Sequence, residues 1–177
     1  ERLGQEIYRP LLKVLTANGY REYEVANTPS YRTGADCDVE GQRDKQPTLF
    51  VFAYDWRRSI DENGEELSDY VACVQQFYPG TKVNIIAHSM GGLVSRRYIL
   101  GYGGDENVEN LITFGTPWLG TPDILKVMLT GKWLEQITDP ETVKDLLIYF
   151  NGAHQLLPSQ HFLDTAKLPI VQEASWD

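Results

Sequence analysis

Residues 83–94, VNIIAHSMGGLV, constrain the fold of this chain more than any other stretch. A run rich in β-branched residues leads into a turn of small residues with Ser89 at its apex, and a helical pattern follows at once. This order predicts a nucleophile elbow, which lifts a serine hydroxyl above the edge of an α/β sheet. Because strand and helix pass close together there, small residues are expected at positions 87 and 91. Ala87 and Gly91 fill them, with alanine where glycine is usual.

The length and charge of the chain limit what surrounds that serine. Its 177 residues fit a single domain with a substantial core. A net charge of −9 makes it a poor candidate for nucleic-acid binding, which depends on neutralising phosphates. Since no Lys/Arg-rich run is present, contact with a lipid surface would have to come from apolar groups. No apolar run is long enough to span a membrane, and we expect neither a metal nor a cofactor.

Two cysteines leave the redox compartment open. Cys37 and Cys73 would pair in an oxidising compartment, or would remain a loop thiol and a core thiol. Cys73 lies in a periodic helical segment, which favours a plain buried thiol. The sequence starts at Glu1 without a methionine or a signal peptide, so we expect an interior point of a longer chain and predict no localisation.

Apolar runs and helical periods alternate along residues 1–115. The predicted elements are helices at 10–18, 59–78 and 90–100 and strands at 49–54, 83–87 and 110–114. Ser59 and Glu62 form a capping-box pattern at the start of the second helix, and a break is expected near Pro10. The order β-α-β-α-β predicts right-handed crossovers and a parallel sheet. Residues 27–47 are predicted to be a loop, and a further helix is possible at 141–150.

Four segments together resemble the lecithin:cholesterol acyltransferase branch of the α/β-hydrolases. They are AYDWRR at 53–58, AHSMGG at 87–92, TFGTPWLGTP at 113–122 and HQLLPS at 154–159. The resemblance covers at least residues 5–160. It implies an α/β-hydrolase-type three-layer sandwich with a mostly parallel sheet, present as a partial domain. Residues 1–115 would be the core with the elbow, and residues 116–177 a cap or lid region with a connection onward.

The same resemblance implies a serine-dependent acyl hydrolase or O-acyltransferase that acts on lipid-like esters through an acyl-Ser89 intermediate. Ser89 would be the nucleophile, and the backbone N–H of Met90 would be an oxyanion-hole donor. In this family the triad acid and base lie well downstream of the elbow, and no such acid loop or late Gly-His segment is recognisable here. Because a serine without its base is a weak nucleophile, we expect a fragment that is inactive alone.

Other residues are minor candidates for the missing triad. Asp123 follows the last predicted strand, although its simplest role is a helix-start residue that favours the helix dipole. With His154 it would give a different esterase with a short internal triad, and His161 is a second candidate base. His88 is expected to shape the turn, because neighbouring side chains on a sharp turn do not face one another. A non-catalytic α/β-hydrolase-like binding module is the alternative from another class.

Two further segments have two interpretations each. Asp55 and a following arginine would form an ion pair that fixes a loop, an interpretation we favour over pocket lining by Asp55 and Trp56. The apolar region 118–134 would be a lid over Ser89, bracketed by two glycines, Gly120 and Gly131, or an ordinary core helix. As a lid it would line the pocket through Trp118 and Leu119 and make transient contact with a lipid surface. The head group, the acyl length and the oligomeric state are not predicted.

Overall fold

The computed structural model describes residues 3–23, 41, 43–132 and 139–166. The elements in chain order are α1 (Leu3–Ala17), the 3-10 helix η1 (Arg43–Lys45), α3 (Ile60–Phe77), β1 (Val83–His88), α4 (Met90–Gly101), α5 (Gly104–Asn107), β2 (Val108–Phe114), α6 (Pro122–Thr130), α7 (Pro140–Leu147), α8 (Asn151–His154) and α9 (Gln160–Ala166). None of the helices in these ranges is long and apolar enough to cross a bilayer.

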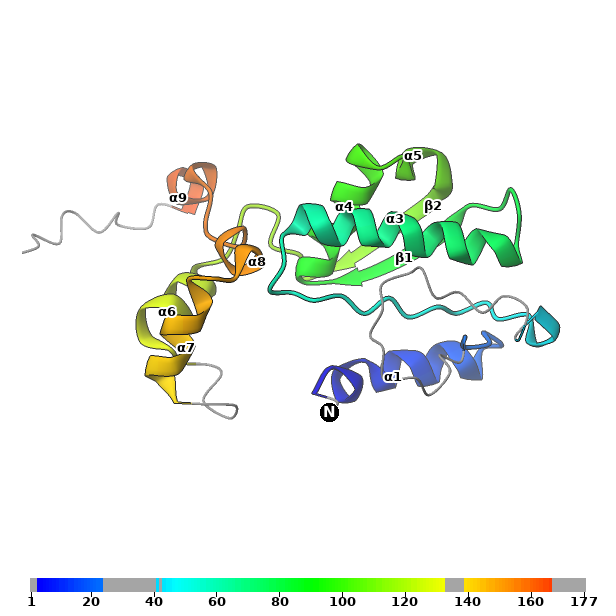
Figure 1. Cartoon of the computed structure of the whole chain (residues 1–177), viewed down its shortest axis with the longest axis horizontal. Helices are drawn as coiled ribbons and strands as arrows, with labels where there is room; N and C mark the ends of the chain where they lie inside the picture. The colour runs from blue at the N-terminus through cyan, green and yellow to red at the C-terminus, as the bar shows by residue number, and fades with distance from the viewer. Residues whose placement is uncertain (1–2, 24–40, 42, 133–138, 167–177) are drawn as a thin grey trace, which may run out of the picture.

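Strands β1 and β2 pair in parallel and form the centre of the fold. Helices α3 and α4 lie on one side of the pair, and α1 lies on the other side (Figure 1). This arrangement confirms the predicted α/β class. The layer on the α1 side is incomplete within the described residues, because Ile86, Ile112 and Phe114 are still 43%, 49% and 54% exposed. The register pairs His88 with Phe114, so both strands end at the same edge of the sheet.

The core of this half lies between the sheet and the two helices that cover it. Leu67 and Val71 of α3 meet Val94 and Tyr98 of α4, and all four side chains are buried. Each aliphatic side chain buried in this way contributes about 1.5–3 kcal/mol to folding. Helix α3 is held at its start by the predicted capping box, in which the Glu62 N–H donates to Ser59 Oγ and the Ser59 N–H donates to the Glu62 carboxylate.

A second core lies between α6 and α7. Its buried members are Ile124, Val127, Val143, Leu147 and Ala153, and they share no member with the first core. Both helices have a proline in the first turn and a side-chain cap, from Thr121 for α6 and from Asp139 for α7. Helices α6 to α9 lie together to one side of the sheet (Figure 1).

Two predicted elements are wrong in detail. Residues 49–54 form no strand, because the pairing described for this run is the isolated parallel bridge between Leu49 and Glu22. A continuous apolar run indicates burial, and here Phe52 and Tyr54 do pack on the first core, but the run does not supply a paired neighbour. Helix α1 begins at Leu3 and runs through Pro10, so the expected break is not found. An interior proline costs about 3 kcal/mol through a lost hydrogen bond and a clash with the preceding turn, which disfavours a helix without forbidding it.

Other expectations are modified. The helix expected at 141–150 begins at Pro140 and ends at Leu147, and the short α8 follows it. Most of the loop predicted at 27–47 lies outside the described residues. Cys73 is buried and disulfide-bonded, so the expectation of a plain thiol is wrong. Burial of a helical cysteine does not decide whether it is oxidised, and Cys37 lies outside the described residues.

Candidate active site

Ser89 stands between the end of β1 and the start of α4, at the apex of the predicted elbow. Its backbone has φ 53° and ψ −129°, a positive φ that among the described non-glycine residues is shared by Gln46 alone. Such a conformation costs on the order of 1–3 kcal/mol and persists only where the surrounding structure imposes it. Here the Ser89 N–H donates to the carbonyl of Phe114 at 2.9 Å. Its hydroxyl is half-buried and makes no hydrogen bond to a described residue.

The helix leaves the elbow through two glycines that differ in their surroundings. A Cβ added to Gly91 would lie 3.6 Å from the Tyr54 hydroxyl and 3.8 Å from Ala87 Cβ, which are ordinary contacts. A Cβ added to Gly92 would lie only 2.1 Å from Thr116 Oγ1. The position that requires glycine is therefore Gly92, and the sequence pattern had pointed to position 91. The Thr116 hydroxyl is buried and has no hydrogen-bond partner among the described residues.

Met90 is the first residue of α4, and its side chain is 6% exposed. The first amides of a helix have no carbonyl partner within the helix, and they carry the positive end of its dipole. The Met90 N–H is one of these amides and directly follows Ser89. It is therefore available to an oxyanion that develops beside the serine.

His88 does not face Ser89 but contacts helix α1. Its Nδ1 lies 2.9 Å from the Tyr8 hydroxyl, and the two rings meet edge to face with centroids 5.8 Å apart. Tyr54 adjoins the elbow at Gly91, and burial, with Tyr8 as the second cause, raises its pKa to about 12. Sequence reasoning missed Tyr8, for which no local signal exists, whereas Tyr54 lies within the quoted AYDWRR segment.

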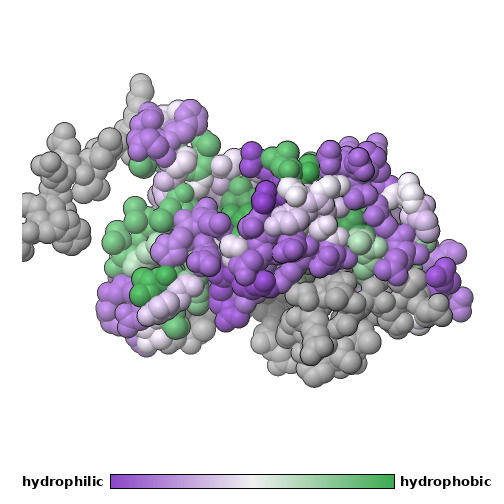
Figure 2. Space-filling model, turned by 45° about the horizontal axis from the view of Figure 1, so that its top comes forward, coloured by the Kyte–Doolittle hydropathy of each residue, from purple (hydrophilic) through white to green (hydrophobic). Residues whose placement is uncertain are grey.

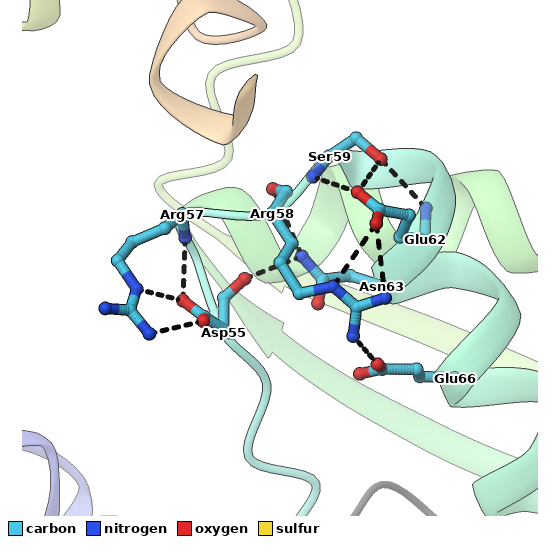
Figure 3. A network of polar contacts seen from close by, with 7 residues as sticks. All are labelled: Asp55, Arg57, Arg58, Ser59, Glu62, Asn63 and Glu66. Carbon is cyan, nitrogen blue, oxygen red and sulfur yellow. Dashed lines mark hydrogen bonds and ion pairs between the residues drawn. The ribbon is translucent and has the colours of Figure 1, made fainter. Parts of the chain in front are cut away.

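Polar side chains of the loop after Tyr54 and of the start of α3 form a network of hydrogen bonds and ion pairs (Figure 3). Both Asp55 carboxylate oxygens accept from the Arg57 guanidinium, at 2.8 and 2.6 Å, and the Arg57 N–H adds a third bond at 3.0 Å. The Arg57 side-chain hydrogen bond is the main reason that the pKa of Asp55 is lowered from its usual value. The buried Asn63 side chain donates to the Asp55 carbonyl at 3.0 Å. The predicted ion pair thus exists, and its partner is Arg57.

Arg58 extends this network along α3, because its guanidinium pairs with both Glu62 and Glu66 (Figure 3). The same loop also contacts α8. The Gly152 N–H donates to the Arg57 carbonyl at 3.1 Å, and the Trp56 and Phe150 rings meet edge to face at 5.3 Å. These contacts favour the interpretation of the loop as a scaffold that joins α3 to α8.

Helix α8 also reaches the elbow itself. A Cβ added to Gly152 would lie 2.0 Å from the Trp56 carbonyl and 3.0 Å from Met90 Cε. The backbone of α8 therefore packs directly against the residue that follows Ser89. This close approach links the second core to the candidate oxyanion donor.

The minor triad candidates are not brought together. His154 Nε2 lies 3.0 Å from the Ile148 carbonyl, and Asp123 sits in the first turn of α6, where its N–H faces the Thr121 hydroxyl. His161 is exposed on α9. Among the described contacts, none joins these three residues to Ser89. No cluster of His, Cys, Asp and Glu in the described ranges is suited to hold a metal ion.

The apolar region 118–134 contains both core residues and exposed residues, and its role as a lid over Ser89 stays a prediction. Ile124 and Val127 are core residues, whereas Leu125 and Leu129 are 44% and 67% exposed. The glycines that bracket the region are points of close packing: a Cβ on Gly120 would meet the Leu157 carbonyl at 2.1 Å, and one on Gly131 would meet the Pro140 carbonyl at 1.9 Å. They do not suggest a hinge. Trp133 and Leu134 lie outside the described residues.

A groove of about 270 Å³ lies between α4 and the segments 117–120 and 155–159. Its walls include Leu93, Arg96, Leu100 and Trp118. Ser89, Asp55, Trp56 and Leu119 do not line it. Trp118 therefore lines a hollow, but one that Ser89 does not line, and the elbow gives the better account of the candidate chemistry.

Comparison with known families agrees with this geometry. The profile of a family described as lecithin:cholesterol acyltransferase matches residues 35–176. A bovine protein named lysosomal phospholipase A and acyltransferase is 30% identical over 83 residues, which are 44% of this chain and 20% of that protein. A triacylglycerol lipase of Pseudarthrobacter phenanthrenivorans is 32% identical over 112 residues, 60% of this chain and 34% of that lipase.

An Arabidopsis thaliana protein named lecithin-cholesterol acyltransferase-like 4 is 33% identical over 90 residues, 48% of this chain and 17% of that protein. Among solved structures, a Bacillus licheniformis lipase in its propeptide form has a TM-score of 0.48 and 18% identity, covering 77% of this chain and 29% of that one. The matches to the three sequence relatives thus span between 17% and 34% of their lengths.

Proposed function

Because the chain belongs to the lecithin:cholesterol acyltransferase family, we propose that it supplies the nucleophile of a serine-dependent acyl hydrolase or O-acyltransferase that acts on lipid-like esters. Ser89 is the nucleophile and forms an acyl-enzyme. The observation that supports this most is the strained backbone of Ser89 at φ 53° between a strand and a helix. A strained residue that its surroundings hold in place is typical of a functional site.

The proposed chemistry has two halves. Ser89 Oγ attacks the ester carbonyl, its proton passes to a general base, and the alcohol leaves, so that the acyl group remains on the serine. Water or an acceptor alcohol then attacks the acyl-serine and restores the hydroxyl. In both steps the Met90 N–H stabilises the tetrahedral oxyanion, which is worth about 3–4 kcal/mol per donor in well-studied cases.

The general base is not among the described neighbours of the serine. His88 is turned to Tyr8, and His154 is bonded to the Ile148 carbonyl. We therefore propose that the described residues supply the nucleophile and one oxyanion donor, and that the chain alone is inactive. A fluorophosphonate probe tests this directly, because it phosphonylates only an activated serine.

Labelling followed by intact-mass measurement and peptide mapping is applied to this chain and to a longer protein that contains it. We expect the label on Ser89 in the longer protein and none on the isolated chain. Ser89→Ala should remove the label, whereas Ser68→Ala should retain it, because the Ser68 hydroxyl donates to the Tyr102 carbonyl beyond the far end of α4. A label on Ser89 of the isolated chain would place a base within it, and absence of label from both proteins would contradict the catalytic role.

The same proposal includes contact between the protein and a lipid surface through α6 and α7. Exposed apolar side chains gather on these helices, at Leu125, Leu129 and Leu146, and just past the end of α7, at Ile148 and Tyr149. Figure 2 shows hydrophobic residues concentrated at this end of the molecule. This extends the predicted region 118–134 to the neighbouring helix.

Flotation with phosphatidylcholine vesicles tests the contact. Leu129→Ser and Tyr149→Ser should each reduce the vesicle-bound fraction, because the two side chains are 67% and 75% exposed. Leu100→Ser is the control, since Leu100 is equally exposed at 66% but lies on α4. An equal loss in all three variants would assign binding to general surface hydrophobicity.

A further inference from the structure

The contact between Tyr8 and His88 joins two parts of the chain that are 80 residues apart. The Tyr8 hydroxyl lies 2.9 Å from His88 Nδ1, and the ring planes are inclined by 68°. It is the one side-chain hydrogen bond described between helix α1 and the strand that carries the serine. Helix α1 is thereby tied to the last residue of β1.

The imidazole is also close to the chain on its other side. A Cβ on Gly115 would lie 3.8 Å from His88 Nε2, so the ring sits between α1 and the turn that follows β2. The residue after His88 is Ser89, whose N–H is bonded to the Phe114 carbonyl. The ring thus lies beside the ends of both strands, at the point where the elbow begins.

The other flank of the serine meets the same group of side chains. The Tyr54 hydroxyl lies 3.6 Å from the position of a Cβ on Gly91, and burial, with Tyr8 as the second cause, raises the pKa of Tyr54. His88, the residue before Ser89, thus contacts Tyr8, and Gly91, two positions after Ser89, adjoins Tyr54.

We propose that Tyr8 is a positioning residue for Ser89, acting through a hydrogen bond from its hydroxyl to Nδ1 of His88. The bond fixes the imidazole and, with it, the backbone that enters the strained turn. This inference rests on the proposed role of Ser89 as the nucleophile. Because Nδ1 accepts, the neutral imidazole carries its proton on Nε2.

The tautomer gives a test that does not depend on activity. In the ¹⁵N spectrum of ring-labelled histidine, at a pH where the imidazole is neutral, His88 should show an unprotonated Nδ1. Tyr8→Phe should change this signal, and Tyr20→Phe should not. Tyr20 is 48% exposed just after the end of α1, and its hydroxyl bonds to no described residue. A protonated Nδ1 in the native protein would overturn the proposed bond.

The rate of fluorophosphonate labelling of Ser89, in whichever protein is labelled, tests the positioning role. Tyr8→Phe should slow labelling by about tenfold, and Tyr20→Phe should leave the rate unchanged. His88→Leu should have a similar effect, and the double variant should be no slower than either single one, because the two residues act as a unit. His88→Asn keeps an acceptor near the Nδ1 position and should restore most of the rate.

The outcomes separate this inference from the proposed function. If the protein with Tyr8 is labelled on Ser89 and its Tyr8→Phe variant is labelled at the same rate, the positioning role of Tyr8 is overturned. The role of Ser89 as the nucleophile then stands. If neither the isolated chain nor the longer protein is labelled, the proposed nucleophile and the positioning role both fail, even where the tautomer shows that the Tyr8–His88 bond exists.

Discussion

The half of the molecule that carries the elbow and the half formed by α6 to α9 are built in different ways. Around Ser89, backbones approach closely, and residues distant in sequence meet, as at Gly92 with Thr116 and Tyr8 with His88. Helices α6 and α7 instead pack on a small core of their own, and many of their apolar side chains remain exposed. The elbow is thus held by contacts between distant segments, whereas α6 and α7 form a separately packed unit that contacts it through α8.

Loss of a core side chain in the second half should have the largest effect. Leu147 is 1% exposed, and Leu147→Ala should cost about 2–5 kcal/mol through lost burial and a cavity. Hydrogen exchange should then increase in α6 and α7 while α3, α4 and the sheet remain protected. Leu129→Ala, at a side chain that is 67% exposed, is the control and should change little. Equal loss of protection in both halves would show that they unfold as one unit.

A methyl group at the elbow should have the next largest effect. Gly92→Ala should destabilise the fold by about 1–3 kcal/mol, because the added Cβ meets Thr116, and Thr116→Ala should restore part of the loss. Gly91→Ala is the matched control, since its nearest contact is 3.6 Å. Urea denaturation gives the free energy of unfolding of Gly92→Ala, of Gly92→Ala combined with Thr116→Ala, and of Gly91→Ala. If Gly91→Ala were as unstable as Gly92→Ala, the close approach of strand and helix would lie at position 91, as the sequence pattern predicts.

The attachment of the two halves can be weakened at α8. The Cβ of Gly152→Ala would lie 2.0 Å from the Trp56 carbonyl, so α8 must move away from the loop. We expect about 1–2 kcal/mol of destabilisation and a change in Trp56 fluorescence as its contact with Phe150 is lost. Asn151→Ala, at an exposed neighbour, should leave both readings unchanged. An unchanged spectrum in Gly152→Ala would mean that α8 adapts without separating.

The smallest effect is expected from acid. The Arg57 hydrogen bond lowers the folded-state pKa of Asp55 below its usual 3.8, so this group stabilises the fold fully above that value. The stabilisation is lost as the pH falls through the lower, folded-state pKa. The stability difference between the native protein and Asp55→Asn should therefore be constant near neutral pH and vanish in strong acid. A difference that persists in strong acid would assign the effect of the substitution to something other than the charge.

Much of the elbow half follows from local sequence. The strand–serine–helix order, the capping box at Ser59 and the pairing of Asp55 with a nearby arginine depend on residues a few positions apart, and the structure contains all three. The family and the α/β class are likewise confirmed. The roles of Ser89 and Met90, and the division of the chain near residue 115, stay predictions.

What the tertiary structure decided are the contacts between distant segments. It placed the critical glycine at position 92 instead of 91, turned His88 toward Tyr8, and brought Gly152 against the loop at Trp56. It also left residues 49–54 without a ladder, although their apolar run had predicted a strand. Local sequence determines caps, turns and periodicity because these depend on neighbours along the chain. Which backbones approach one another depends on the packing of the whole fold, and no single segment encodes it.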